Sequence, residues 1–106
     1  MAFPSNAQML DLLVLAVLNR QDAYGYQISQ QIKAATGAKD STLYPVLRRL
    51  QENQELETYD QQYQGRNRRY YSITPKGRSH YQEILAEWNA YKEAIDQIVN
   101  GGVDSE

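Results

Sequence analysis

The fold is decided by the ten residues Ser41-Thr42-Leu43-Tyr44-Pro45-Val46-Leu47-Arg48-Arg49-Leu50. Their apolar side chains recur every three or four residues, which predicts a helix with a buried stripe made of Leu43, Val46, Leu47 and Leu50. Either Asp40 or Ser41 can cap the start of this helix, and Asn53 lies near its end. Pro45 is tolerated because it falls early in the helix, where backbone amides lack intrahelical partners.

Two more helices are predicted on the N-terminal side of this stretch. Residues 23–35 carry apolar side chains at helical spacing, namely Tyr24, Ile28, Ile32 and Ala35, and Gly37 follows as a stop. Between Met9 and Leu18 only Asp11 is not apolar, so a helix there is expected to be buried almost all round. One short chain rarely covers both sides of such a helix, and we therefore expect a second subunit to cover it.

A β-hairpin and a long helix are predicted on the C-terminal side. Residues 56–63 and 69–73 are rich in Tyr and Thr, and the turn residues 64–68 separate them. Leu56 and Tyr59 differ in parity, which favours a bulge or a late strand start. Thr74 and Pro75 then begin a helix whose apolar seam runs through Tyr81, Ile84, Leu85, Trp88, Tyr91, Ile95 and Ile98.

These elements predict a mainly α fold with a small β-hairpin, arranged as a winged helix-turn-helix with an added C-terminal helix. We expect a winged-helix domain over residues 1–74, a dimerisation helix over 75–100 and a flexible tail over 101–106. Residues 6–19 are expected to belong to the dimer interface as well. The 106 residues, 42% of them hydrophobic and 23% charged, suit one small domain.

Charge is distributed unevenly along the chain. The formal net charge is −2, yet residues 41–80 carry seven basic side chains against four acidic ones. A local basic surface attracts phosphate whatever the average charge. The chain has no cysteine, one histidine (His80) and no glycine-rich phosphate loop, so we expect no enzyme activity, metal or cofactor. His80 is expected at the surface, and the short apolar run at residues 12–18 indicates no membrane span and a cytoplasmic protein.

Two segments carry the features of nucleic-acid binding. The first is the start of the central helix, with the candidate contacts Lys39, Ser41, Thr42, Tyr44, Arg48 and Arg49. The second is the turn, with the candidate contacts Gly65, Arg66, Asn67 and Arg68, beside which we find no acidic residue. Simpler explanations stay open. Ser41 and Thr42 can be only a helix cap, Arg48 and Arg49 only a solvated pair, and the turn only a soluble loop. Arg69 can instead point back into the domain.

Three motifs together resemble the PadR family of winged-helix regulators. Residues 41–50 resemble its recognition helix, residues 65–74 its wing, and Tyr24-Gly25-Tyr26 the start of its second helix. Asp40 departs from the small residue that is common before the serine. The resemblance implies a homodimeric repressor on operator DNA with an inverted repeat. Its dimer contacts are expected from both terminal helices, at Leu10, Leu13, Val14, Val17, Tyr81, Ile84, Leu85, Trp88 and Ile95.

Some similar members of that family bind flat aromatic or cationic molecules between two tryptophans at the dimer centre. The resemblance places Trp88 there and implies a planar aromatic effector held by Asp11, Leu12, Leu15, Trp88 and Tyr91. Trp88 is also explained as dimer core and Asp11 as a first-turn acid, and Lys92 would oppose a cation if it faced the same cavity. A protein-interaction module without specific DNA binding is the alternative function.

Overall fold

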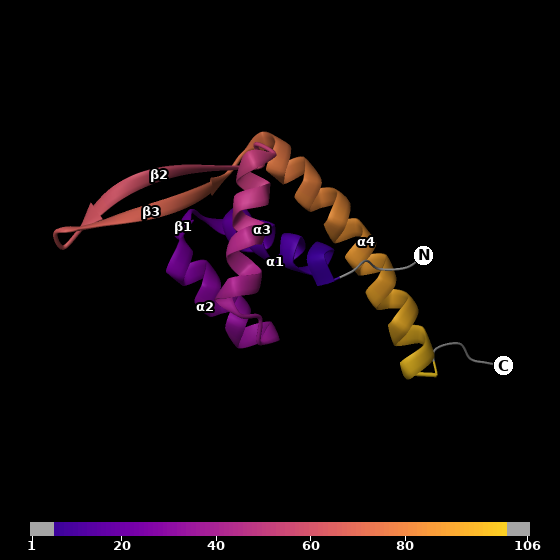
Figure 1. Cartoon of the computed structure of the whole chain (residues 1–106). Coiled ribbons are helices and arrows are strands. Elements are labelled where there is room, and N and C mark those ends of the chain that lie inside the picture. The colour runs from indigo at the N-terminus through magenta and orange to yellow at the C-terminus, as the bar shows by residue number, and fades with distance from the viewer. Residues whose placement is uncertain (1–5, 102–106) are drawn as a thin grey trace.

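The computed structural model describes residues 6–101, and side chains from Ala7 onward. The elements are α1 (Asn6–Arg20), β1 (Ala23–Tyr24), α2 (Gly25–Thr36), α3 (Asp40–Glu52), β2 (Leu56–Tyr63), β3 (Arg66–Ile73) and α4 (Pro75–Val99). Figure 1 shows α1, α2 and α3 packed into one body, with the β2–β3 hairpin and α4 leaving it on opposite sides. The expected fold class is therefore confirmed. Of the tail expected over 101–106, all but Gly101 lies outside the described residues.

The hydrophobic core joins the helical body to the two elements that project from it. The following side chains are all nearly inaccessible to solvent: Leu15, Leu18, Ile28, Leu43, Leu47, Leu50, Leu56 and Ile84. They come from α1, α2, α3, β2 and α4, and each contributes about 1.5–3 kcal/mol by leaving water. The predicted stripe of α3 is confirmed, since Leu43, Val46, Leu47 and Leu50 are its buried residues.

Helix α1 is covered by its own chain more completely than the sequence predicts. Leu10, Leu12, Val14 and Leu15 are all buried without any second subunit. The chain itself therefore covers more of this helix than expected, which leaves less of it for a second subunit. Met9, Leu13 and Val17 are only partly buried, so they mark the part of α1 that remains open to a partner.

The sheet holds two features that the sequence pattern did not indicate. It has three strands in the order β1-β3-β2, because Ala23 and Tyr24 pair with Tyr71 and Tyr70 before α2 begins. The helix predicted from residue 23 therefore starts at Gly25. Strands β2 and β3 pair in continuous antiparallel register over residues 56–63 and 66–73, so neither the bulge nor the late strand start that the sequence favoured is present.

The turn of the hairpin is shorter than predicted. Only Gln64 and Gly65 separate the strands, with φ angles of 51° and 77°. Positive φ at both central residues is typical of two-residue turns whose twist matches the flanking strands, and Gly65 adopts it at little cost. The arginines predicted for a turn at 64–68 therefore lie on strand β3, whose pleat fixes the directions of their side chains.

The predicted stop of α2, the predicted cap of α4 and Asn53 at the end of α3 are confirmed, whereas the predicted cap at the start of α3 is not. Gly37 ends α2 in the left-handed conformation, with φ of 77°. Thr74 caps α4 as predicted, because its Oγ1 accepts a hydrogen bond from the Gly77 amide at 3.0 Å. The residue before α3 is Lys39, which makes no side-chain cap, so the predicted cap at Asp40 or Ser41 was wrong.

Helix α4 changes character along its length. Its first half packs on the core through buried Ile84 and partly buried Tyr81, Leu85 and Trp88. Its last turns extend away from the body (Figure 1), where Ile98 and Val99 are 78% and 73% exposed. No helix in the described part of the chain combines the length and apolar character needed to cross a membrane.

Candidate nucleic-acid interface

The start of α3 presents polar side chains to solvent. Lys39, Ser41, Thr42 and Tyr44 are all exposed. Ser41, Tyr44 and Arg48 are spaced by three and four residues, so they form one outward stripe along the helix. The opposite stripe of α3 is the buried one described above, and packing of that stripe fixes which residues face outward.

Tyr44 is the member of this stripe that lies next to the sheet. A Cβ atom added to Gly25 would stand 3.4 Å from the Tyr44 ring and 3.8 Å from the Tyr71 ring. Burial, reinforced by the charge of Asp40 and by Tyr71, raises the pKa of Tyr44 above its ordinary value. The phenol therefore stays neutral at physiological pH and keeps its O–H as a hydrogen-bond donor.

Strand β3 presents its arginines in three different ways. Arg66 is exposed beside the turn. The guanidinium of Arg68 lies over two rings, 4.3 Å from the centroid of Tyr24 and 4.0 Å from that of Tyr63. Stacking on the two rings holds the guanidinium in place, and the N–H groups at its edge stay available to a hydrogen-bond acceptor.

Arg69 pairs across the hairpin with Asp60. Its Nε lies 3.6 Å from the Asp60 Oδ1, and both side chains are more than half exposed. The sequence interpretation that no acid lies near the arginines was therefore wrong, and the alternative that Arg69 points back into the domain does not hold. Antiparallel register explains the error, because it places residue 60 opposite residue 69 although the two are distant in sequence.

Tyrosines stiffen the base of the hairpin. The ring of Tyr70 stacks on Tyr59 and meets Tyr24 edge-on, each at 5.5 Å between centroids. The Tyr59 hydroxyl donates to the Asp22 carboxylate at 2.7 Å, and this bond raises the Tyr59 pKa. The strands are thus tied to the segment before α2, which limits how far the hairpin can swing relative to the helices.

A cleft of about 580 Å³ brings Tyr44 of the first predicted segment together with the second predicted segment. It is lined by Tyr24, Gly25, Tyr26, Tyr44, Arg66, Asn67, Arg68, Arg69 and Tyr71. Tyr44 comes from the start of α3, and the arginines and Asn67 come from β3. The tyrosines of this cleft other than Tyr44 were not among the predicted contacts, although the motif Tyr24-Gly25-Tyr26 and the tyrosine-rich strands were the available signal.

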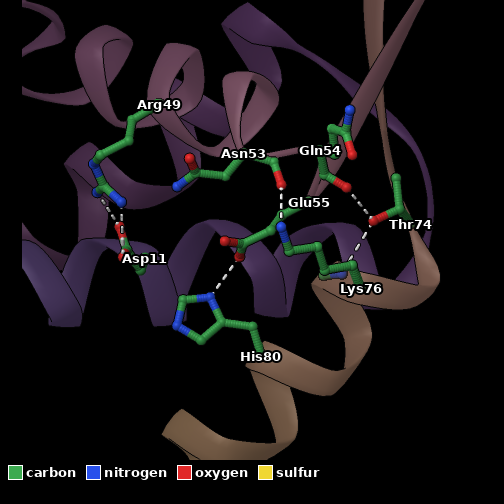
Figure 2. Close-up of polar contacts among 9 residues, drawn as sticks. Asp11, Arg49, Asn53, Gln54, Glu55, Thr74, Lys76 and His80 are labelled. Atoms are coloured by element: carbon green, nitrogen blue, oxygen red, sulfur yellow. Dashed lines mark hydrogen bonds and ion pairs between the residues drawn. The ribbon is translucent and has the colours of Figure 1, made fainter.

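Arg49 does not belong to the outward stripe of α3. Its Nη2 and Nη1 donate to the two carboxylate oxygens of Asp11, at 2.6 and 3.3 Å, as Figure 2 shows. The Asp11 side chain is only 7% exposed. The bond to Asp11, with the charges of Asp11 and Glu55, raises the Arg49 pKa further above its already high value. Asp11 and Arg49, predicted for effector and DNA respectively, thus neutralise each other.

The remaining predicted effector residues differ in access. Leu12 and Leu15 are buried in the core of their own chain. Trp88 and Tyr91 are partly buried on α4, with ring centroids 6.3 Å apart, and the Lys92 Nζ lies 5.9 Å from the centroid of the Trp88 ring.

His80, predicted at the surface, is instead partly buried and contacts the buried carboxylate of Glu55. Within residues 6–101, no group of three or more His, Cys, Asp or Glu side chains gathers as a metal site would require.

Comparison with known proteins agrees with this geometry. Residues 14–83 match the model of the transcriptional regulator PadR-like family. A protein of uncharacterised function from Lysinibacillus sphaericus is 37% identical over 97 residues, which cover 87% of this chain and 89% of that protein.

Solved structures extend the likeness to the whole chain. A crystal structure of a Streptococcus mutans protein matches all of both chains at 42% identity with a TM-score of 0.86. A PadR family transcription regulator from Clostridium difficile matches at 28% identity and a TM-score of 0.76, covering 85% of this chain and 97% of that one. The family consists of regulators and not enzymes, and this chain is a member of the PadR-like family of transcriptional regulators.

Proposed function

We propose that this regulator is a sequence-specific, homodimeric DNA-binding protein that acts as a repressor in the cytoplasm. The observation that carries the proposal is the cleft in which the start of α3 and the arginines of β3 meet. A winged helix places its recognition helix in the major groove, and arginines on the wing suit the adjacent minor groove or backbone.

The proposal gives each side chain a role that follows from its chemistry. Ser41, Thr42 and Tyr44 offer hydroxyls to base edges and phosphates near the start of α3, where the amides of the first turn also favour an anion. Lys39 and Arg48 are exposed cations beside them and suit phosphate contacts. Arg49 is left out of the contact surface because Asp11 already accepts its donors.

The wing contributes contacts of a second kind. Arg66, Asn67 and Gly65 lie at its tip, where a guanidinium or a backbone amide can reach a phosphate. Arg68 is pre-positioned between Tyr24 and Tyr63, so less side-chain entropy is lost when it meets an acceptor. These contacts add affinity and orientation and little sequence information.

A dimer is supported by apolar surface that one chain leaves uncovered. Ile95, Ile98 and Val99 are exposed on the distal part of α4, and Leu13 and Val17 are only partly buried on α1. Two-fold symmetry would present two α3 helices to successive major grooves, about 34 Å apart, and so select an inverted repeat.

Relief of repression by a planar aromatic molecule is the last part of the proposal. Trp88 and Tyr91 offer neighbouring ring faces on α4, and stacking on such faces is favourable for flat ligands. Because Lys92 lies beside the Trp88 ring, we expect a neutral or anionic effector and not a cation. Trp88 fluorescence during titration with neutral, anionic and cationic planar compounds tests this expectation, and quenching by the cations alone would contradict it.

Selection of duplexes from a randomised pool tests DNA binding most sharply. Wild-type protein is expected to enrich an inverted repeat, and Tyr44→Phe or Ser41→Ala is expected to relax the preference at particular base pairs. Arg66→Gln is expected to weaken binding to all duplexes about equally, because phosphate contacts carry no sequence information. Arg20→Gln, which removes an exposed positive charge from the end of α1, is the control. Recovery of no enriched sequence would favour the protein-interaction module.

A further inference from the structure

The contacts drawn in Figure 2 connect the recognition helix to both helices expected to form the dimer. On one side, the Nη1 and Nη2 groups of Arg49 in α3 donate hydrogen bonds to the Asp11 carboxylate in α1. On the other side, the end of α3 is bonded to the start of α4. The Lys76 Nζ donates to the Asn53 carbonyl at 2.8 Å, and the Thr74 Oγ1 donates to the Gln54 carbonyl at 2.8 Å.

Glu55 completes this connection. Its backbone carbonyl accepts the Thr74 amide at 3.0 Å, and its buried carboxylate contacts His80 of α4. Its charge also acts on Arg49, whose pKa it helps to raise. The Asp11–Arg49 pair thus links α3 to α1, and the residues that follow α3 link it to α4.

We propose that Asp11 and Arg49 are positioning residues that fix the rotation of the recognition helix relative to α1, and thereby tune operator affinity without touching DNA. This inference rests on the DNA-binding function proposed above. A planar guanidinium that bonds to both oxygens of one carboxylate fixes direction as well as distance, which a hydrophobic contact does not do.

The pair is buried on one side only, since the Asp11 side chain is 7% exposed and the Arg49 side chain 44%, and such a pair adds little to stability. An exposed ion pair contributes about 0–1 kcal/mol. A buried pair can often be replaced by apolar side chains of similar size without loss, so a pair of either kind is weak evidence for stability. Arg49 also directly follows Arg48, which lies on the outward stripe. With side chains, a helix is about 10–12 Å across, so turning α3 by about 10° would move that stripe by about 1 Å.

Rotation of α3 has a specific consequence in a two-fold dimer. The same turn in both protomers changes the phase between the two recognition helices along the DNA. The preferred separation of half-sites therefore depends on the angle of α3, whereas a mere loss of folded protein lowers binding to every separation by the same factor. Half-site spacing is thus a readout that separates positioning from stability.

The test uses Asp11→Leu combined with Arg49→Met, an apolar replacement expected to keep the protein folded. The probes are the duplex that wild-type protein enriches and versions with the half-sites one base pair closer or farther apart. We expect the double variant to bind the enriched duplex about tenfold more weakly, with a flatter preference among spacings. We also expect its salt dependence to equal that of wild-type protein. Arg49→Lys keeps the charge but loses the two-bond geometry. We expect its affinity and its spacing preference to lie between those of wild-type protein and of the double variant.

Arg48→Gln is the matched control, since it removes the neighbouring arginine from the outward stripe. It is expected to keep the spacing preference and to make the salt dependence shallower. If the double variant keeps wild-type affinity and spacing preference, this inference is overturned while the proposed function stands. A salt dependence as shallow as that of Arg48→Gln would have the same consequence. If wild-type protein enriches no duplex, the proposed function fails and this inference with it.

Discussion

Replacement of Gly77 by alanine tests the junction between α4 and the winged-helix body. Gly77 is buried in the first turn of α4, and a Cβ atom added there would stand 2.3 Å from the Glu55 carbonyl oxygen and 2.8 Å from the Ile73 side chain. Ordinary contact begins near 3.4 Å, so α4 must move by about 1 Å. The obstacle at Glu55 is backbone and cannot turn away as a flexible side chain can.

The cost can be estimated from the groups that must move. Overpacking of a well-packed site costs about 1–3 kcal/mol. The Glu55 carbonyl also accepts the Thr74 amide, and weakening that bond adds about 1 kcal/mol. We therefore expect Gly77→Ala to lower the free energy of unfolding by about 3 kcal/mol and Tm by more than about 10 °C in a domain of this size.

The sign of the change decides between two explanations of this glycine. In a helix free of contacts, alanine is more favourable than glycine by about 1 kcal/mol, so Tm would rise. Thermal and urea unfolding followed by circular dichroism, at one protein concentration, measure the change. Ser79→Ala, at an exposed position two residues further along α4, is the control and should stay within about 0.5 kcal/mol. An unchanged or raised Tm in Gly77→Ala would refute the packing described here.

Three further predictions concern a cap, the dimer and a phenol. Thr74→Ala removes the cap of α4 and should cost about 1–2 kcal/mol in urea unfolding, whereas a loss just as large in Thr74→Ser would argue against the hydroxyl as its cause. Trp88→Ala should weaken self-association, measured by sedimentation, by about tenfold or more, whereas Asn89→Ala should leave it unchanged. Equal effects of the two substitutions would contradict the placement of Trp88 in the dimer interface. Because the Tyr44 pKa is raised, its phenol is neutral at both pH 7 and pH 9, and Tyr44→Phe should weaken DNA binding by the same factor at both. A loss that disappears at pH 9 would show that the phenol ionises earlier.

Local patterns predicted most of the helices because their causes are local. The stripe at Leu43, Val46, Leu47 and Leu50, the stop at Gly37 and the cap at Thr74 each depend on residues a few positions apart. The two-residue strand β1 was missed because it is too short to show any periodicity.

The site was harder to predict where it depends on contacts distant in sequence. Helical spacing required at least one of Arg48 and Arg49 to face outward, but only the packing of α1 on α3 decides that Arg49 meets Asp11. Likewise, the strand register brings Asp60 to Arg69, and the close approach of α4 to Glu55 explains Gly77. None of these contacts leaves a signal in composition or spacing.

The central claim is that α3 and the wing bind DNA through the side that holds the cleft. The most direct measurement is the salt dependence of affinity for the enriched duplex, by fluorescence anisotropy, with wild-type protein and Arg66→Gln. We predict that the logarithm of affinity falls linearly with the logarithm of salt concentration, and that the slope for Arg66→Gln is shallower by about 1 per protomer. A slope near zero in wild-type protein, or the same slope in both proteins, would contradict the claim.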